Sequence, residues 1–160
     1  MPSCDSPVKL GKTCTTGKPV VKWYYDTKML YCYPYKYLGC DEGSNSFATQ
    51  DECFSMCKPA DQVSCGGNTD ILGNCSPHDG GDSCPAGQIC VNGGNIGLCC
   101  DKKIQEAWDL EQSPKCKQGS PVQISVWYGK TPLIGRNCSH RFCPDDSKCI
   151  QGKWTAHCCK

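Results

Sequence analysis

Cysteine content constrains this chain more than any other feature. Eighteen of its 160 residues are cysteine, and few aliphatic residues remain to build a core. Small domains with so little apolar mass do not offset their conformational entropy by burial alone. Disulfide bonds supply the missing stability, about 2–4 kcal/mol each, and they persist only in oxidising compartments. The sequence therefore predicts a small disulfide-rich protein that is secreted and extracellular.

The cysteines fall into three consecutive sets of six, and each set is even, so each block can close its own bridges. The sets are Cys4, Cys14, Cys32, Cys40, Cys53, Cys57; then Cys65, Cys75, Cys84, Cys90, Cys99, Cys100; then Cys116, Cys138, Cys143, Cys149, Cys158, Cys159. Six cysteines allow about fifteen pairings, and spacing alone does not choose among them. The blocks predict three domains, at residues 1–58, 64–101 and 115–160.

The second and third blocks are repeats of one another. Both end in the pattern C-x5-C-x8-C-C, and a proline, Pro85 or Pro144, follows the first cysteine of that pattern. Both also carry Asn-Cys-Ser, which makes Asn74 and Asn137 candidates for N-glycosylation. The adjacent cysteines at each end do not comfortably bridge each other, so they should reach different strands or loops. We expect loop-rich six-cysteine knots with short strands, in which positive-φ positions fall to Gly80-Gly81 and Gly93-Gly94.

Charge differs between the blocks. Residues 61–115 hold 3 basic and 8 acidic residues, a net charge of −5, whereas residues 116–160 hold 7 and 2, a net charge of +5. Ordinary surface charge that keeps the protein in solution is the simplest interpretation. The two blocks could instead attract each other, or the last block could dock onto an acidic partner such as a sulfated polysaccharide.

The first block predicts a twisted β-hairpin followed by a helix. Residues 20–25 and 29–37 are rich in β-branched and aromatic residues, as strands are, and residues 26–28 make the turn between them. Pro34 must then lie on the edge of the hairpin or at a bulge. Thr49 and Glu52 form a capping box that begins a helix over residues 50–56. This helix places Cys53 and Cys57 one turn apart on one face.

Two further elements are expected outside the first block. In the linker of residues 101–115, Ile104 and Trp108 share one helical face, and Pro114 would stop that helix. We expect Trp108 to pack on a neighbouring module. Residues 122–128 alternate as a strand does, and residues 129–132 should make the turn after it.

The cysteine spacing C-x9-C-x17-C-x7-C-x12-C-x3-C of residues 4–57 resembles the Kunitz, or pancreatic trypsin inhibitor, domain. The aromatic run of residues 23–25, the segment 35–40, Asn45 and Phe47 also match that family. The resemblance implies an α+β domain, with a twisted β-hairpin and a C-terminal helix, that inhibits serine proteases. It also implies three bridges: Cys4–Cys57, Cys14–Cys40 and Cys32–Cys53.

In this family an exposed loop around the second cysteine enters the protease cleft, and the residue after that cysteine fills the primary pocket. The matching loop here consists of Lys12, Thr13, Cys14, Thr15, Thr16, Gly17, Lys18 and Pro19, with Leu38 and Gly39 beside it. Thr15 suits an elastase-like pocket better than a trypsin-like one. The loop is also longer than usual, and we expect its glycine to loosen it. Leu38 stands where the family prefers a glycine that lets the chain pass close to the loop.

The second and third blocks resemble lustrin-type cysteine-rich repeats, which imply an extracellular module without a settled activity. Two functions follow for the whole chain. The first is a secreted Kunitz-type inhibitor with an atypical, lengthened reactive loop. The alternative is a non-inhibitory extracellular module that binds a receptor, a channel or the matrix.

No catalytic or metal-binding pattern is visible. The usual nucleophile, phosphate-loop and zinc-protease motifs are missing. Paired C-x2-C spacings are missing too, and the histidines, His78, His140 and His157, are scattered. No apolar run is long enough to cross a bilayer. We expect no enzyme activity, cofactor, metal, nucleic-acid partner or membrane span. Because no secretory signal precedes Cys4, we also expect a mature form.

Overall fold

The computed structural model describes residues 3–59, 63–76, 83–94 and 96–160. The chain forms two compact units: residues 1–58 together with 114–160, and residues 59–113. The first and third cysteine blocks therefore belong to one unit, and the second block forms the other. Within the described ranges, no helix has the length and apolar character needed to cross a membrane.

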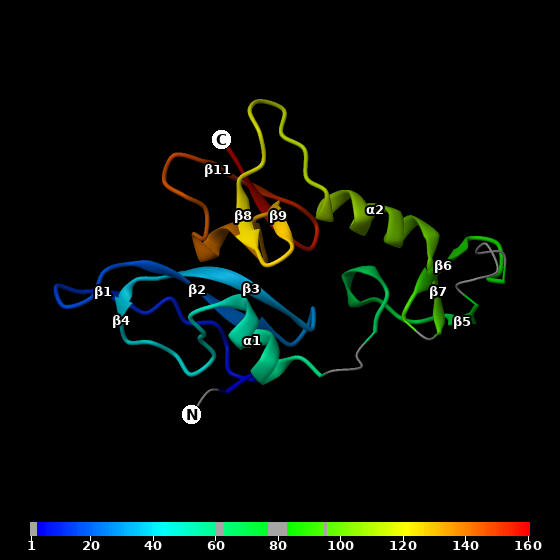
Figure 1. The fold of residues 1–160 in the computed structure, drawn as a ribbon, viewed down its shortest axis with the longest axis horizontal. Coiled ribbons are helices and arrows are strands. Elements are labelled where there is room, and N and C mark those ends of the chain that lie inside the picture. Colours follow the sequence, from blue (N-terminus) through cyan, green and yellow to red (C-terminus); the bar gives the residue numbers. More distant parts are fainter. Residues whose placement is uncertain (1–2, 60–62, 77–82, 95) are drawn as a thin grey trace. The chain divides into compact units, whose positions relative to one another are not determined.

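A two-stranded antiparallel hairpin is the centre of the first block (Figure 1). Its strands are β2 (Val20–Asp26) and β3 (Tyr31–Tyr37), and Trp23 lies opposite Pro34. Among the described strands, β3 pairs with β2 alone, so Pro34 removes no ladder hydrogen bond from a third strand.

The turn of the hairpin is longer than the sequence indicates. The Asp26 carboxylate accepts hydrogen bonds from the backbone N–H groups of Lys28 and Met29, both at 2.9 Å. The backbone then passes through Leu30, which has a left-handed φ of 57°. The expectation that the second strand begins at Met29 is therefore wrong, because the turn continues to Leu30 and the strand begins at Tyr31.

Helix α1 (Gln50–Cys57) packs against this hairpin, and the bridge Cys32–Cys53 joins the two. The Thr49 hydroxyl accepts a hydrogen bond from the Glu52 backbone N–H at 3.1 Å, so the predicted cap is present. The Glu52 carboxylate accepts from the backbone of Ala48, one residue earlier than in a standard capping box.

The core of the first block follows the family resemblance. Tyr25 and Phe47 are buried with the two cysteines of the hairpin–helix bridge. Asn45 is buried beside them, where it accepts from the Tyr25 backbone N–H and donates to the Tyr25 carbonyl, both at 2.9 Å. The bridges of this block are Cys4–Cys57, Cys14–Cys40 and Cys32–Cys53, the pairing that the Kunitz resemblance implies.

The second block is a three-stranded sheet with a helix after it. The strand order is β5 (Gly73–Cys75), β7 (Gly97–Asp101), β6 (Gln88–Asn92). Helix α2 (Lys102–Gln112) follows and places Trp108 against Gly66, in the short helix η1 (Gly66–Asn68). The predicted linker helix is thus part of the second compact unit. Of the expected positive-φ glycines, Gly94 has φ of 98°, but Gly93 does not have a positive φ, so that part of the expectation is wrong. Gly80 and Gly81 lie outside the described residues.

The third block repeats this sheet, with the order β10 (Ile134–Gly135), β12 (Ala156–Cys159), β11 (Lys148–Gln151). A short helix, η2 (Cys138–His140), precedes β11. An additional hairpin of β8 (Gln123–Val126) and β9 (Gly129–Pro132) fills the longer insertion after Cys116.

This additional hairpin corrects one prediction. Residues 129–132 are a strand and not a turn, since Val126 pairs with Gly129 and the turn is Trp127-Tyr128. The two aromatic side chains are 88% and 67% exposed. The alternating sequence pattern includes these two residues, so it extends the predicted strand past its true end at Val126.

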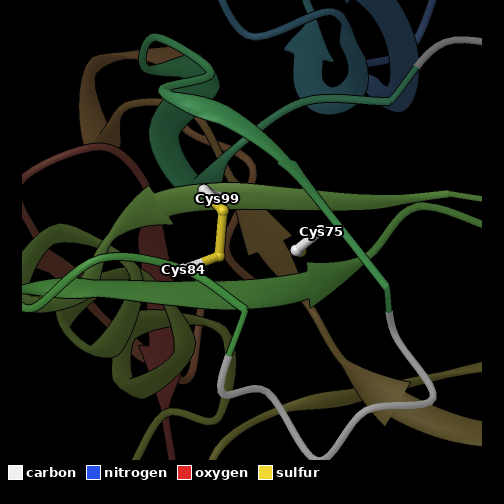
Figure 2. Close-up of side chains that lie close together, drawn as sticks. All are labelled: Cys75, Cys84 and Cys99. Atoms are coloured by element: carbon white, nitrogen blue, oxygen red, sulfur yellow. A yellow bond between two sulfur atoms is a disulfide. The ribbon is translucent and has the colours of Figure 1, made fainter.

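Bridge topology is the same in the two repeats. The second block has Cys65–Cys100, Cys75–Cys90 and Cys84–Cys99, and the third has Cys116–Cys159, Cys138–Cys149 and Cys143–Cys158. Figure 2 shows the bond from Cys84 to Cys99 on the central strand, with Cys75 close by. In each block the two adjacent cysteines reach different partners, as predicted.

Candidate binding loop

The loop around Cys14 is held at its base by a disulfide and a small sheet. Strand β1 (Lys12–Thr13) pairs with β4 (Gly39–Cys40), with Lys12 opposite Cys40 and Thr13 opposite Gly39. The Cys14–Cys40 bridge fixes the same two segments one residue further on. Residues on both sides of the bridge are exposed: Lys12 and Thr13 before Cys14, and Thr15, Thr16, Lys18 and Pro19 after it.

Two glycines allow the loop and its neighbouring segment to touch. A Cβ placed on Gly17 would lie 2.2 Å from the Gly39 carbonyl oxygen, and one on Gly39 would lie 2.6 Å from the Gly17 oxygen. Gly39 also has φ of 122°, which other residues rarely adopt. The geometry gives Gly17 a packing role, against the expectation that it loosens the loop. Gly39 provides the close approach that the sequence assigns to the Leu38 position.

Thr15 and Thr16 have different surroundings although they are neighbours. The Thr16 hydroxyl lies over the bridge, 3.6 Å from the Cys14 sulfur and 3.4 Å from the Cys40 sulfur. Thr15 is exposed directly after the disulfide, and no hydrogen bond of its side chain is found in the described part of the chain. Of these two threonines, only Thr16 contacts the bridge through its hydroxyl.

The far side of the loop borders the third block. Lys18, Pro19 and the first residues of β2 line one wall of a hollow of about 700 Å³. Residues 141–145 of the third block line the opposite wall, and Lys36 approaches Asp145 at 3.8 Å across it. This wall could not be predicted from the sequence, because cysteine spacing describes each block alone and gives no signal of packing between blocks.

A mixed polar and apolar interface joins the third block to the β2–β3 hairpin. Trp23 packs against the third-block core of Leu133 and Phe142. The Arg136 guanidinium lies 3.3 Å from the Asp26 carboxylate, and the ring of His140 meets that of Tyr24 edge-on at 5.4 Å. Burial is the largest influence on the His140 imidazole, and it lowers the pKa of that group.

Ion pairs hold the segment behind the loop. The Lys9 ammonium lies 2.9 Å from the Asp41 carboxylate, and this hydrogen bond lowers the pKa of Asp41. Lys22 pairs with Glu42, and the hydrogen bond from Lys22 lowers the pKa of that carboxyl in the same way. Both acids follow Cys40 directly, so the pairs tie the inner end of the Cys14–Cys40 bridge to the body of the domain.

Two clusters in the described ranges bring together three residues of metal-ligating type. One is Cys75, Cys84 and Cys99, and the other is Cys116, His157 and Cys159. All five cysteine sulfurs are already in disulfide bonds. They therefore offer no thiolate, which is the form that binds zinc.

Comparison with known proteins identifies the class. Residues 3–58 match the family model of the Kunitz/Bovine pancreatic trypsin inhibitor domain. A BPTI/Kunitz inhibitor domain-containing protein of Caenorhabditis elegans is 58% identical over 158 residues, covering 99% of this chain and 89% of the relative. Major allergen Ani s 1 of Anisakis simplex is 34% identical over 172 residues, covering 98% of this chain and 86% of the allergen.

A shorter match covers the first block only. Kunitz-type serine protease inhibitor A of Rhipicephalus microplus is 42% identical over 36 residues, which is 22% of this chain and 30% of that protein. No solved structure matches the chain.

The fold and the loop define a Kunitz-type, protease-inhibitor-like protein with many disulfide bonds. The chain belongs to the BPTI/Kunitz family, and the two long matches extend this relationship through the second and third blocks. Kunitz domains act as inhibitors rather than enzymes, and their general partners are proteases. The bridges and the relatives together indicate an extracellular protein.

Proposed function

We propose that this chain inhibits a serine protease of the elastase-like class through the loop of residues 12–19, with Thr15 in the primary pocket. The observation that carries the proposal is the exposure of Thr15 on a loop that is clamped by Cys14–Cys40, by β1–β4 pairing and by the Gly17–Gly39 contact. A loop held in one conformation loses little entropy on binding. The extra residues of this loop are therefore compatible with inhibition.

The size and neutrality of Thr15 set the expected specificity. A trypsin-like pocket has a buried carboxylate, and a threonine would leave it unpaired. Losing such a buried charge pair typically costs about 2–5 kcal/mol. An elastase-like pocket accepts small uncharged side chains and has no such cost. Lys12 and Lys18 are exposed cations of this loop and would contact the rim of the partner's pocket.

Two matched substitutions test the loop register. Purified chain is titrated against elastase-, chymotrypsin- and trypsin-like proteases, alongside Thr15→Arg and Thr16→Arg. We expect inhibition of the elastase-like enzyme by the natural sequence, and a gain of about a hundredfold or more in trypsin inhibition for Thr15→Arg alone. A gain for Thr16→Arg instead would contradict the assignment of Thr15. Nanomolar trypsin inhibition by the natural sequence would move the anchor to Lys18 or Lys12, and Lys→Ala variants would distinguish them.

The second candidate is a non-inhibitory extracellular module that binds a receptor, a channel or the matrix. The wall formed by residues 141–145 favours it, because this wall stands beside Lys18 and Pro19 and narrows the approach to that side of the loop. Failure to inhibit any protease in the panel, with the fold intact, would select this function.

We also propose that the protein is secreted and has three modules, at residues 1–58, 64–101 and 115–160, the last two being lustrin-type repeats. Their shared cysteine pattern and shared bridge order support this division. Peptide mapping of the natural protein tests it, since a bridge between modules would contradict the proposal.

A further inference from the structure

Four lysines of the third block surround one hollow. Lys115 and Lys117 flank Cys116, Lys148 lies opposite Cys159 in the β11–β12 ladder, and Lys160 follows Cys159. Because Cys116 and Cys159 are bridged, the four lysine backbones gather around a single disulfide. They line a hollow of about 810 Å³, together with the bridged cysteines, Gln118, Gly119, Asp146, Ser147 and Ile150.

The backbone around this hollow is firmly held. Ser120 and Lys160 exchange two backbone hydrogen bonds, at 2.9 and 3.0 Å, beside the Cys116–Cys159 bridge. Gly119 has φ of 77°, and a Cβ there would lie 2.2 Å from the Lys160 carbonyl oxygen. The lysines therefore project from fixed backbone positions, although their side chains are exposed.

Positive charge at the hollow is only partly neutralised. Asp146 is the one acidic residue in its described lining, and it pairs with Lys160. That hydrogen bond lowers the pKa of Asp146, so the pair is formed at neutral pH. In the described part of the chain, no ion pair is found for Lys115, Lys117 or Lys148. Three cations thus face one hollow, and residues 116–160, which follow Lys115, add a net charge of +5 from 7 basic and 2 acidic residues.

We propose that this hollow binds a sulfated sugar segment of an extracellular polysaccharide. Sulfate groups carry permanent charge and several acceptor oxygens, which suit a ring of lysine ammonium groups. The hollow lies within the usual volume range of ligand sites, about 300–1,000 Å³. The oxidising environment that the bridges require is also the extracellular space in which such polysaccharides occur. Lys117 and Lys148, on opposite sides of the bridge, would make the main contacts.

The test measures binding of the full chain to a heparin-derived hexasaccharide by calorimetry at about 0.15 M salt, where distant surface charges are screened. The variant Lys117→Ala/Lys148→Ala removes two cations from the hollow. The control Lys130→Ala/Lys153→Ala removes two exposed cations of the same block that do not line it. We expect the first variant to bind about tenfold more weakly or worse, and the control to change affinity less than about threefold.

Equal losses in both variants would assign binding to overall charge and overturn the proposal, as would unchanged binding by Lys117→Ala/Lys148→Ala. A desulfated hexasaccharide that keeps its carboxylates should bind much more weakly. Equal binding of that sugar, or of an acidic peptide, would overturn the sulfate assignment. Inorganic sulfate at matched sulfate concentration should compete poorly, and full competition would show a simple anion site. Thermal unfolding of each variant verifies the fold.

Discussion

In the second and third cysteine blocks alike, the first cysteine bonds to the sixth, the second to the fourth and the third to the fifth. Both blocks also place the strand with the adjacent cysteines at the centre of a three-stranded sheet. They differ in what covers that sheet. The second block belongs to a unit with helix α2, whereas the third belongs to a unit with the Kunitz hairpin.

Side chains around the shared framework explain this difference. In the second block, Trp108 of α2 covers Gly66, and the Gln105 side chain accepts a hydrogen bond from the Gly66 backbone at 2.8 Å. In the third block, Phe142 is 1% exposed and lies over Gly135, where a Cβ would come within 2.3 Å of the ring. Trp23 of the Kunitz hairpin completes that cluster. One disulfide framework thus supports two packing arrangements, because helix α2 covers the second block and the Kunitz hairpin covers the third.

The largest effect is expected from Phe142→Ala. Removal of a buried phenylalanine typically costs about 3–5 kcal/mol, and this one joins the third block to the Kunitz hairpin. Trp23, Trp127 and Trp154 report on the first unit, and Trp108 reports on the second. Denaturant unfolding is followed in two backgrounds, one that retains only Trp23 and one that retains only Trp108. Phe142→Ala should lower the stability reported by Trp23 and leave that reported by Trp108 unchanged. The matched variant Leu98→Ala should lower the stability reported by Trp108 and leave that reported by Trp23 unchanged. An unchanged Trp23 transition in Phe142→Ala would contradict the packing of these blocks as one unit.

Much of the first block could be predicted from sequence. The cap at Thr49 and the hairpin are local patterns whose partners are near in the chain, whereas the position of Asn45 follows from the family resemblance. Bridge order in the repeats could not be predicted, because spacing is compatible with several pairings. The Trp127-Tyr128 turn was missed because composition continues the alternating pattern through it.

The binding loop and the interface with the third block show the same limit of prediction from sequence. The Gly17–Gly39 contact depends on two segments whose separation is set by a disulfide, so the sequence shows a glycine without its packing partner. Likewise, Trp23 fits the alternating pattern of an ordinary strand, and the sequence of that strand does not indicate which block covers its side chain. Patterns within one element identify its buried face. They do not identify the distant residues that bury it.

Two bridges allow a matched test of the shared framework. Cys84–Cys99 and Cys143–Cys158 occupy equivalent positions, and each has a sequence separation of 15. From loop-closure entropy alone, each bridge is expected to stabilise the folded state by about 3 kcal/mol. We expect paired Cys→Ala variants to lose similar stability in denaturant unfolding, followed through Trp108 for the second unit and through Trp23 for the first. A difference between the two losses well above about 1 kcal/mol would show that packing, rather than chain closure, sets the stability that each bridge contributes.

The polar side of the third-block interface should make the first unit sensitive to acid. His140 faces Tyr24, Asp26 and Arg136, with Asp5 and Lys28 also lining the adjacent hollow. Burial lowers its pKa in the folded state, so the unfolded chain binds the proton more readily. The contribution of His140 is therefore present above its usual pKa of about 6.5 and is lost as pH falls below that value.

We expect the melting temperature of the first unit to fall between about pH 7.5 and pH 5.5, and to fall less in His140→Gln. Thermal scans that follow Trp23 fluorescence at each pH measure this difference. Asp26 acts in the opposite direction, since its negative charge favours protonated His140. Asp26→Asn should accordingly steepen the pH dependence. The same slope in the natural sequence and in His140→Gln would show that other groups control the acid response.

The smallest effect concerns the asparagines of the two Asn-Cys-Ser sequences. Asn137 precedes η2, and its side chain accepts a hydrogen bond from the Ser139 backbone N–H at 2.8 Å. Asn74 is exposed in the edge strand β5 and has no such cap to provide. In unglycosylated protein, Asn137→Ala should lose about 1 kcal/mol and Asn74→Ala close to none, as caps of this kind predict. Denaturant unfolding of each unit measures both losses, and equal losses would refute this difference.

Because both asparagines are exposed, we expect N-glycans at each in a eukaryotic secretory pathway. Mass loss after glycosidase treatment of the Asn74→Gln and Asn137→Gln proteins would show which site is occupied.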